Sequence, residues 1–335
     1  MDYVVTGGTG WLGKNLVQRL LSSGDEVGAV RCLCFENEKE EMTRLFEGRV
    51  EFIAGDVKDP KSLSRLFEGK SGATLIHLVG VIHPKLRSRE FDLVNYDGTK
   101  NTIEAALAAG VRKAVVMSSN SPMGCNPHRD HLFTEESPYA PYMGYGKSKW
   151  KMEVYLRNMM QKDGCFPISI IRAPWFYGEG QPARQKEFFE MIRKGKGPIV
   201  GGGENKRSMV YIDNLCQGIL LAARKEEADN EIFWIADKRP YSMNEIIDTV
   251  ERLLETDYGQ SCHKGRLRLP GVFSEVALCM DWTLQQLGLY HQKIHVLSEM
   301  NKTIACSIEK AERVLGYVPE VALEEGMRRS LAEYY

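Results

Sequence analysis

The sequence has no marked excess of charge and no feature of a secreted protein. Lysine and arginine total 44 against 45 aspartates and glutamates, so the formal net charge of −1 provides no general field that would attract nucleic acid. The first residues, MDYVVTGG, contain neither a basic segment nor a long apolar one, and we expect no secretory signal. The composition therefore favours a small-molecule substrate, bound at a local site, over a nucleic acid.

Cysteine pairs and long uncharged apolar runs are also missing. The eight cysteines form no CxxC pair, so we predict neither a disulfide framework nor a zinc site, and we expect reduced thiols in a cytoplasmic protein. The segment HRDH (128–131) has no further ligand at a known spacing, and we predict no metal. The apolar stretch 272–289 contains Glu275 and Asp281, which predicts a packed amphipathic helix and no membrane span.

Short runs rich in β-branched residues alternate with longer helical patterns over the first two thirds of the chain. The runs are YVVT (3–6), EVGAV (26–30), VEFIA (50–54), TLIHLV (74–79), KAVVMSS (113–119) and ISIIR (168–172). This alternation predicts an α/β fold with a Rossmann-type doubly wound parallel sheet. We assign residues 1–172 to this domain, with later segments returning to it, and residues 173–335 mainly to a smaller C-terminal lobe that binds substrate over the carboxyl edge of the sheet.

Three glycines follow the first strand pattern. The segment VVTGGTGWLGKNL places Gly7, Gly10 and Gly13 between that strand and an amphipathic helix. A tight turn and a close approach of the backbone to a pyrophosphate both need residues without Cβ, and the following helix offers free N–H groups to the phosphates. We therefore predict that this loop binds a dinucleotide.

A tyrosine and a lysine in YGKSK form the candidate catalytic pair. Tyr145 and Lys149 lie four residues apart in a helical pattern, so both side chains project from one face. An ammonium beside a phenol stabilises the phenolate and eases proton exchange at neutral pH. Tyr145 is predicted to act as an acid toward a ketone or a base toward an alcohol. Tyr139 and Tyr142 have no basic residue four positions on, and we interpret them as packing or rim residues.

The glycine spacing GxxGxxG after Thr6 resembles the extended form of the short-chain dehydrogenase/reductase superfamily. That form includes NAD-dependent epimerases and dehydratases and 3β-hydroxysteroid dehydrogenase-like enzymes. The resemblance continues through GDV (55–57), LIHLVG (75–80), VNYDGTKNTIEAALAAGV (94–111), YGKSK (145–149) and SIEKAERVLGYVP (307–319), and so covers nearly the whole chain.

The resemblance implies further site residues. Ser119 matches the catalytic hydroxyl, with Ser118 and Ser121 as alternatives, and Asn95 matches the asparagine that supports the lysine. Relatives often pair through the helix that bears the tyrosine, so we also consider a homodimer. The implied cofactor contacts are Gly7, Thr9, Gly10, Trp11, Leu12, Gly13, Asp56, Val57, Leu78, Val79, Tyr145, Lys149 and Pro174.

The choice between the two nicotinamide cofactors depends on Arg31. The pattern EVGAVR places this arginine at the end of the second strand, where NAD-using relatives carry an acidic residue. An arginine there can pair with a 2′-phosphate, which a carboxylate would repel. We therefore expect NADP as the cofactor, with NAD as the second choice.

The sequence defines the catalytic residues more closely than the net reaction and its substrate. Ser119, Asn120 and Ser121 replace the family's TDE pattern, so dehydration is set aside. Trp175 stands where nucleotide-sugar epimerases carry an asparagine, which favours contact with a bulky apolar substrate. Against this, Arg207 and Arg184 are candidates for binding a phosphate.

Three functions remain open. We expect an NAD(P)-dependent oxidoreductase that transfers a hydride at a secondary alcohol or ketone, as 3β-hydroxysteroid dehydrogenases do. A nucleotide-sugar epimerase is the alternative. A non-catalytic NADP-binding regulator is disfavoured because Ser119, Tyr145 and Lys149 are all present. In each case the predicted substrate-binding residues are Ser121, Trp175, Arg184 and Arg207.

Overall fold

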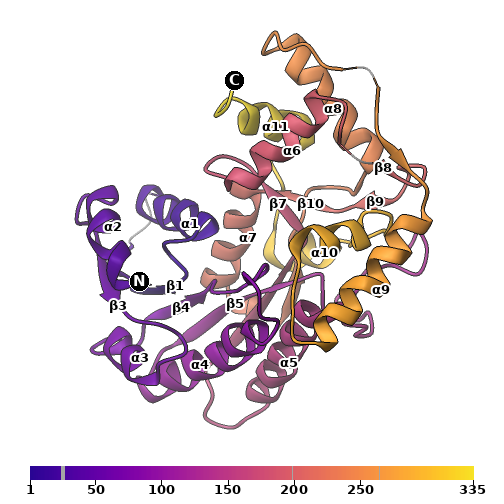
Figure 1. Cartoon of the computed structure of the whole chain (residues 1–335). Coiled ribbons are helices and arrows are strands. Elements are labelled where there is room, and N and C mark those ends of the chain that lie inside the picture. The colour runs from indigo at the N-terminus through magenta and orange to yellow at the C-terminus, as the bar shows by residue number, and fades with distance from the viewer. Residues whose placement is uncertain (24–26, 198, 264) are drawn as a thin grey trace.

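A seven-stranded parallel sheet forms the centre of the computed structural model, which describes residues 1–23, 27–197, 199–263 and 265–335 (Figure 1). The strand order is β11-β6-β5-β4-β1-β2-β3, so the order reverses between β1 and β4. The predicted Rossmann-type doubly wound sheet is confirmed. The strands are β1 (Tyr3–Thr6), β2 (Val30–Cys34), β3 (Val50–Ala54), β4 (Thr74–His77), β5 (Lys113–Ser119), β6 (Ile168–Ala173) and β11 (Ile232–Trp234).

Helices cover both faces of this sheet because successive strand residues point to opposite sides. Val5 packs in one hydrophobic cluster with Leu16 and Leu215, whereas its neighbour Val4 packs in another with Leu63 and Ile103. One face is therefore covered by α1 (Trp11–Ser22) and α7 (Ile212–Arg224), and the other by α3 (Pro60–Phe67), α4 (Gly98–Ala108) and α5 (Met143–Met160) (Figure 1).

The second strand differs from its prediction. The run 26–30 was expected to be extended, but β2 begins only at Val30, which pairs with Tyr3 at the start of β1, and continues to Cys34. Residue 26 lies outside the described part of the chain. Gly28 donates to the Met1 carbonyl oxygen and Ala29 accepts from the Tyr3 N–H, both at 2.9 Å, but neither residue belongs to a strand. The start of β2 thus matches the start of its partner β1, which the local sequence does not reveal.

The C-terminal lobe holds short strand pairs and further helices. Ser242 accepts a hydrogen bond from the Glu245 backbone N–H at 3.0 Å and so caps α8 (Met243–Thr256), and Gly316, with a φ of 62°, ends the helical segment before it. The strand pairs are β10 (Met209–Tyr211) with β7 (Trp175–Tyr177), β12 (Tyr241–Ser242) with β9 (Lys206–Arg207), and β13 (Arg268–Leu269) with β8 (Ile199–Val200).

The remaining helices divide between the two parts of the chain. The sheet domain also contains η1 (Glu36–Glu38), α2 (Lys39–Leu45) and the π-helical turn η2 (Asp92–Asp97). Later in the chain come α6 (Ala183–Arg193), η3 (Glu226–Ala228), α8 (Met243–Thr256), α9 (Val272–Gln286), α10 (Gln292–Glu299), η4 (Ala311–Leu315) and α11 (Leu323–Leu331).

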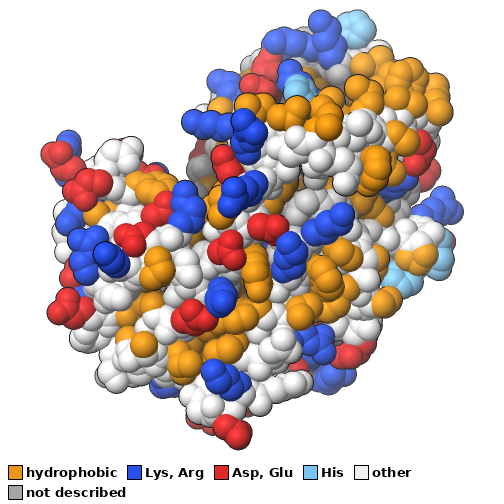
Figure 2. Space-filling view, turned by 60° about the horizontal axis from the view of Figure 1, so that its bottom comes forward, with side chains coloured by type: hydrophobic (Ala, Val, Ile, Leu, Met, Phe, Trp, Pro, Cys, Tyr) orange, Lys and Arg blue, Asp and Glu red, His pale blue; other side chains and the backbone are white. Residues whose placement is uncertain are grey.

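The surface mixes both signs of charge with hydrophobic side chains, as the face in Figure 2 shows. The predicted helix in 272–289 forms as α9 and packs against α10. Its buried residues are Ser274, Ala277 and Asp281, whereas most of its large apolar side chains face outward. Within the described residues, no helix is both long and apolar enough to cross a lipid bilayer.

A buried ion pair joins α5 to β6. Arg172 donates to Glu153 at 2.7 Å, and both side chains are almost fully buried. Glu153 also accepts hydrogen bonds from Ser118 at 2.5 Å and Tyr139 at 2.8 Å. Such a network satisfies two buried charges together, but neither partner is stable there alone.

We predict that Glu153→Gln destabilises the protein by about 3–5 kcal/mol, because the substitution leaves the Arg172 guanidinium buried without its counter-charge. Urea unfolding measures the change. The double variant Glu153→Leu with Arg172→Met, which removes both charges, should recover most of the loss. A single variant as stable as the wild type would contradict the assignment.

Candidate active site

The glycine loop lies where the strand order reverses, between the carboxyl ends of β1 and β4. Gly7 has a φ of 79°, and a Cβ atom on it would come within 3.0 Å of the Val79 backbone. A Cβ atom at Gly13 would overlap the Gly7 carbonyl oxygen. Gly10, in contrast, meets only that carbonyl oxygen at 3.4 Å and caps α1 without a side-chain hydrogen bond. The first N–H groups of α1 are therefore suited to bind a pyrophosphate.

Trp11 connects this loop to the C-terminal lobe. Its indole N–H donates to the Glu179 carbonyl oxygen at 2.6 Å, and its ring centroid lies 4.9 Å from that of Phe176. Thr9 is half-buried beside it, and Leu12 is buried in the core. Pro174 links β6 to β7, which contains Phe176. The loop thus has a rigid support on the side that faces the lobe.

Asp56 and Val57 follow β3 at the same edge. The Asp56 carboxylate accepts from the Lys58 backbone N–H at 2.9 Å and pairs with the Lys58 ammonium at 3.2 Å. Val57 is buried, and a Cβ atom at Gly98 would touch its side chain. Leu78 and Val79, which directly follow β4, are half-buried beside the glycine loop. This placement is suitable for an adenosine, but the contacts themselves stay a prediction.

Arg31 does not lie where the sequence placed it. It is the second residue of β2, opposite Val4, and the strand continues for three more residues. Its guanidinium donates to Glu51 at 2.7 Å and to the carbonyl oxygens of Leu66 and Glu68. The prediction that Arg31 ends the strand is therefore wrong, whereas its contact with a 2′-phosphate stays a prediction.

The true end of β2 is followed by an aromatic residue and an acid. Phe35 and Glu36 come directly after Cys34, and both are exposed. Glu36 opens the short helix η1, in which Glu38 accepts a hydrogen bond from the Phe35 backbone N–H at 3.1 Å. The apolar residues Cys32, Leu33 and Cys34, which continue beyond Arg31, were the sequence signal for this longer strand.

The structure brings together the three predicted catalytic side chains. Ser119 ends β5, and Tyr145 and Lys149 lie one turn apart on α5; all three are buried. Burial raises the pKa of Tyr145 to about 12, although its hydrogen bond with Ser119 opposes the shift. Burial also lowers the pKa of Lys149 to about 8, while the Glu153 carboxylate opposes the shift. Tyr145 is therefore protonated at neutral pH and able to donate a proton.

Asn95 supports the site through the backbone. Its side chain donates to the Val81 carbonyl oxygen and to Ser148, both at 3.0 Å, and accepts from the Val81 N–H at 2.8 Å. Gly80 lies close to both Lys149 and Asn95. A Cβ atom on it would be 3.4 Å from the Lys149 ammonium and 3.5 Å from the Asn95 amide oxygen. The Lys149 ammonium itself donates to the Met117 carbonyl oxygen at 2.9 Å. Asn95 thus holds the segment after β4 against α5.

Sequence reasoning did not identify Glu153 and Arg172 as parts of this site. Glu153 lies four residues after Lys149 and eight after Tyr145, so all three occupy the same face of α5. Its bonds to Arg172 and Ser118 hold that face against β5 and β6. The spacing on α5 was a usable signal, but the arginine partner is visible only in the fold.

An aromatic cluster packs against Tyr145, and sequence reasoning also missed it. The Phe91 ring centroid lies 6.0 Å from that of Tyr145, and Tyr290 meets Phe91 edge-on at 5.5 Å. Ile82 packs against the same three rings. His83 and the Tyr290 hydroxyl are 2.5 Å apart. Residues from three distant segments therefore give the catalytic tyrosine an apolar neighbourhood.

The predicted substrate residues occupy different surroundings. Ser121 is buried with its hydroxyl 3.4 Å from that of Ser119. Trp175 packs edge-to-face against Phe188, with centroids 5.5 Å apart. Arg207 donates a hydrogen bond to the Glu299 carbonyl oxygen. The side chain of Arg184 lies outside the described part of the structure.

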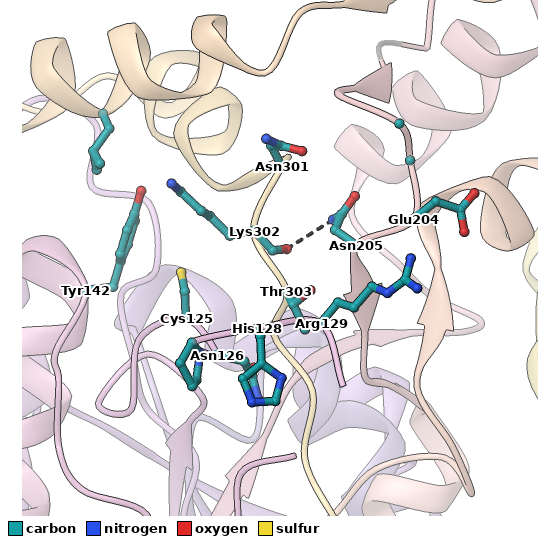
Figure 3. A pocket seen from close by; sticks show the side chains of 14 residues that line it. Cys125, Asn126, His128, Arg129, Tyr142, Glu204, Asn205, Asn301, Lys302 and Thr303 are labelled. Carbon is teal, nitrogen blue, oxygen red and sulfur yellow. Dashed lines mark hydrogen bonds between the residues drawn. The ribbon is translucent and has the colours of Figure 1, made fainter. Parts of the chain in front are cut away.

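A polar pocket of about 620 Å³ opens beside the start of α5. Figure 3 shows Lys302 reaching across it toward Tyr142, with Arg129 and Glu204 on the opposite side. The amide oxygen of Asn205 is buried there without a partner among the described atoms. Further lining comes from Cys125, Asn126, His128, Asn301 and Thr303. Within the described residues, no group of three or more His, Cys, Asp or Glu side chains could hold a metal ion.

We predict that Tyr145→Phe lowers turnover by about a thousandfold or more and leaves cofactor affinity nearly unchanged, because only the proton donor is lost. Turnover and cofactor binding are measured on the same sample. Tyr142→Phe, one turn earlier on the chain, is the matched control and should keep most of the activity. Equal losses in the two variants would contradict the role of Tyr145.

Comparison with known proteins places these features in a family. The model of the NAD dependent epimerase/dehydratase family matches residues 3–236. An uncharacterised Sinorhizobium fredii protein, y4nL, is 50% identical over 98% of this chain and 93% of its own length. The Escherichia coli N-acetyl-alpha-D-glucosaminyl-diphospho-ditrans,octacis-undecaprenol 4-epimerase is 30% identical over 60% of each chain. An Arabidopsis thaliana 3beta-hydroxysteroid-dehydrogenase/decarboxylase is 24% identical over 99% of this chain and 79% of its own.

Solved structures agree on the fold. The UDP-glucose 4-epimerase of Thermotoga maritima superposes with a TM-score of 0.76 at 22% identity, over 100% of this chain and 98% of that one. The resemblance inferred from the motifs is confirmed, from the glycine loop to the YGKSK segment. The chain belongs to the NAD dependent epimerase/dehydratase family of extended short-chain dehydrogenase/reductase enzymes.

Proposed function

We propose that this enzyme transfers a hydride at a secondary alcohol or ketone of a bulky, largely apolar substrate. The apolar surroundings of Tyr145 carry this proposal. Phe91, Tyr290 and Ile82 surround the tyrosine, and Trp175 stands in place of a polar residue next to Phe188. Aromatic walls of this kind favour a hydrophobic ligand over a hydrated sugar.

The remaining polar side chains suit this chemistry. A nicotinamide dinucleotide, held by its pyrophosphate at the glycine loop, would supply or accept the hydride. Tyr145, protonated at neutral pH, donates a proton to the oxygen of a ketone, and Ser119 donates a hydrogen bond that orients the same oxygen. Lys149, one turn along the helix, stabilises the phenolate that results. In the oxidative direction the same groups act in reverse.

Arg207 does not decide between the reductase and the epimerase. Its guanidinium donates one hydrogen bond to the Glu299 carbonyl oxygen, which leaves further N–H groups for a phosphate. The Arabidopsis relative is named as a 3β-hydroxysteroid dehydrogenase, which is the same class of reaction. Its identity to this chain, 24%, supports the class of reaction and not a particular substrate.

An epimerase on a diphosphate-linked sugar is the second candidate. The polar pocket favours it, because Arg129 and Lys302 place two cations beside the start of the catalytic helix, although Lys302 is already paired with Glu275. The undecaprenol-linked relative from Escherichia coli is named as such an epimerase. Under this reading the diphosphate would occupy the pocket, while the sugar would reach toward Tyr145.

For the cofactor we propose NAD, in place of the NADP first expected. The acid that follows β2, Glu36, stands where a ribose 2′-hydroxyl is bound in dinucleotide folds, and its carboxylate would repel a 2′-phosphate. Arg31, the residue on which NADP depended, is held by Glu51 and two carbonyl oxygens.

We predict that the enzyme binds NADH about tenfold or more tightly than NADPH, because one repelled charge is worth at least about 1.4 kcal/mol at this site. Fluorescence titration measures both constants. Glu36→Gln should reduce the difference, whereas the control Glu40→Gln, on the exposed helix α2, should not. Preference for NADPH in the wild type would overturn the proposal.

We predict that a polycyclic ketone raises the melting temperature of the NADH complex, while UDP-sugars do not. The reason is that only a ligand that binds the folded protein stabilises it against unfolding. Thermal shift measures both. Trp175→Asn should weaken the ketone effect, with Trp150→Asn, a tryptophan exposed on α5, as the matched control. Stabilisation by a UDP-sugar that is lost in Arg129→Ala would favour the epimerase instead.

A further inference from the structure

Helix α9 presents an apolar stripe to the surface. Val272, Val276 and Met280 repeat every four residues on one side of the helix, Leu287 follows on that side just after the last helical residue, and these four are 60, 52, 51 and 70% exposed. Phe273 lies beside them and is 47% exposed. Hydrophobic side chains gather at the upper right of Figure 2, on the same side of the molecule as α9 in Figure 1. Isolated apolar side chains are normal on a surface, but an ordered row of this length is not.

The buried side of the same helix is polar. Ser274 donates to the Ser298 carbonyl oxygen at 2.7 Å, and Asp281 accepts from His295 on α10 at 2.7 Å. Gln285 donates to Asp281 at 2.9 Å. A rotation of α9 that buried the stripe would break these hydrogen bonds, and their loss is costly for the buried Asp281 carboxylate. The hydrogen bonds on the buried side of α9 therefore keep the stripe facing outward.

The charges around the stripe are mainly positive. The one acid on the exposed part of α9, Glu275, is paired with Lys302. At the far end of the helix, the loop 85–89 lies against residues 288–290, because Tyr290 donates from its backbone to the Leu86 carbonyl oxygen at 2.9 Å. In this loop Lys85, Arg87 and Arg89 are exposed, and none makes an ion pair within the described residues. Leu86 between them is 55% exposed.

We propose that α9 and the loop 85–89 dock onto the surface of an anionic lipid membrane. An apolar stripe with Trp282 at its margin, flanked by cations, matches the interfacial region of a bilayer, where apolar side chains enter and cations meet lipid phosphates. The helix lies on the membrane and does not span it. The attraction comes from the local loop, because the net charge of −1 provides none.

A second copy of the chain is a poorer match to this surface. Arg268 is exposed just before the helix begins, and the cationic loop lies at its other end. Two stripes paired in parallel would bring the loops together, and an antiparallel pair would bring each loop near the other copy's Arg268. Both arrangements place like charges opposite one another, whereas anionic lipid neutralises them.

The surface formed by α9 and the loop 85–89, the docking face, adjoins the residues that pack around Tyr145. Gln285 near the end of α9 accepts from the Gly144 backbone N–H at 2.7 Å, next to Tyr145. Tyr290, just after the stripe, packs on Phe91, which in turn packs on Tyr145. If the proposed function holds, an apolar substrate could pass from the lipid to the aromatic cluster without crossing water.

Vesicle flotation measures the docking without measuring turnover. Failure of the docking proposal is therefore distinguishable from failure of the proposed reaction. The full chain should float with phosphatidylcholine vesicles that contain phosphatidylserine. Val276→Glu with Met280→Glu should lower the bound fraction about tenfold or more, since two charges would enter the apolar layer. Leu45→Glu with Val318→Glu, two residues similarly exposed elsewhere, is the matched control and should bind normally.

The cationic loop has its own test. Lys85→Glu with Arg87→Glu should lower binding about tenfold or more on the anionic vesicles, because two cations that meet the lipid phosphates are replaced by anions, and added salt should lower wild-type binding. Cofactor affinity confirms that each variant is folded. Absence of wild-type binding, or equal binding by the stripe variant, overturns the proposal. So does a dimer, seen by analytical ultracentrifugation, that the stripe variant abolishes.

Discussion

The buried pair of Glu153 and Arg172 is the interaction on which the catalytic geometry depends. It joins the middle of α5 to β6, and Ser118 and Tyr139 complete the coordination of the carboxylate. Because Tyr145 and Lys149 precede Glu153 by two turns and one turn on the same face, the pair sets how that face meets the end of β5. Ser119 is the last residue of β5, so its distance from the phenol is fixed by the same contact.

The reactive groups share an environment that changes their proton affinities in complementary ways. Burial raises the pKa of Tyr145 and lowers the pKa of Lys149. The phenol therefore keeps its proton, whereas the ammonium loses its proton more easily than that of an exposed lysine. Glu153 opposes the shift at Lys149 from one turn away. The same carboxylate therefore serves both the fold and the charge balance of the site, a combination that a surface ion pair could not provide because water would screen it.

Helix α9 has polar contacts on its buried side and apolar groups on its exposed side, the reverse of an ordinary surface helix. Asp281, His295 and Ser274 hold α9 and α10 together beneath the stripe. The arrangement leaves hydrophobic side chains exposed close to the segment that covers Tyr145. The active site and the proposed docking face are thus two sides of one structure, connected through Phe91 and Tyr290.

The sequence alone was sufficient for the features that depend on local spacing. The glycine loop, the Tyr145 and Lys149 pair and most strands follow from periodicity and from residues without Cβ, because neighbours in the chain determine them. Other features depended on partners distant in sequence. The place of Arg31 was decided by the pairing of β2 with β1, the role of Glu153 by Arg172, and the aromatic cluster by segments around 82–91, 145 and 290. The outward turn of the α9 stripe was likewise decided by tertiary contacts, since an amphipathic pattern shows which side is apolar but not which side the fold will bury.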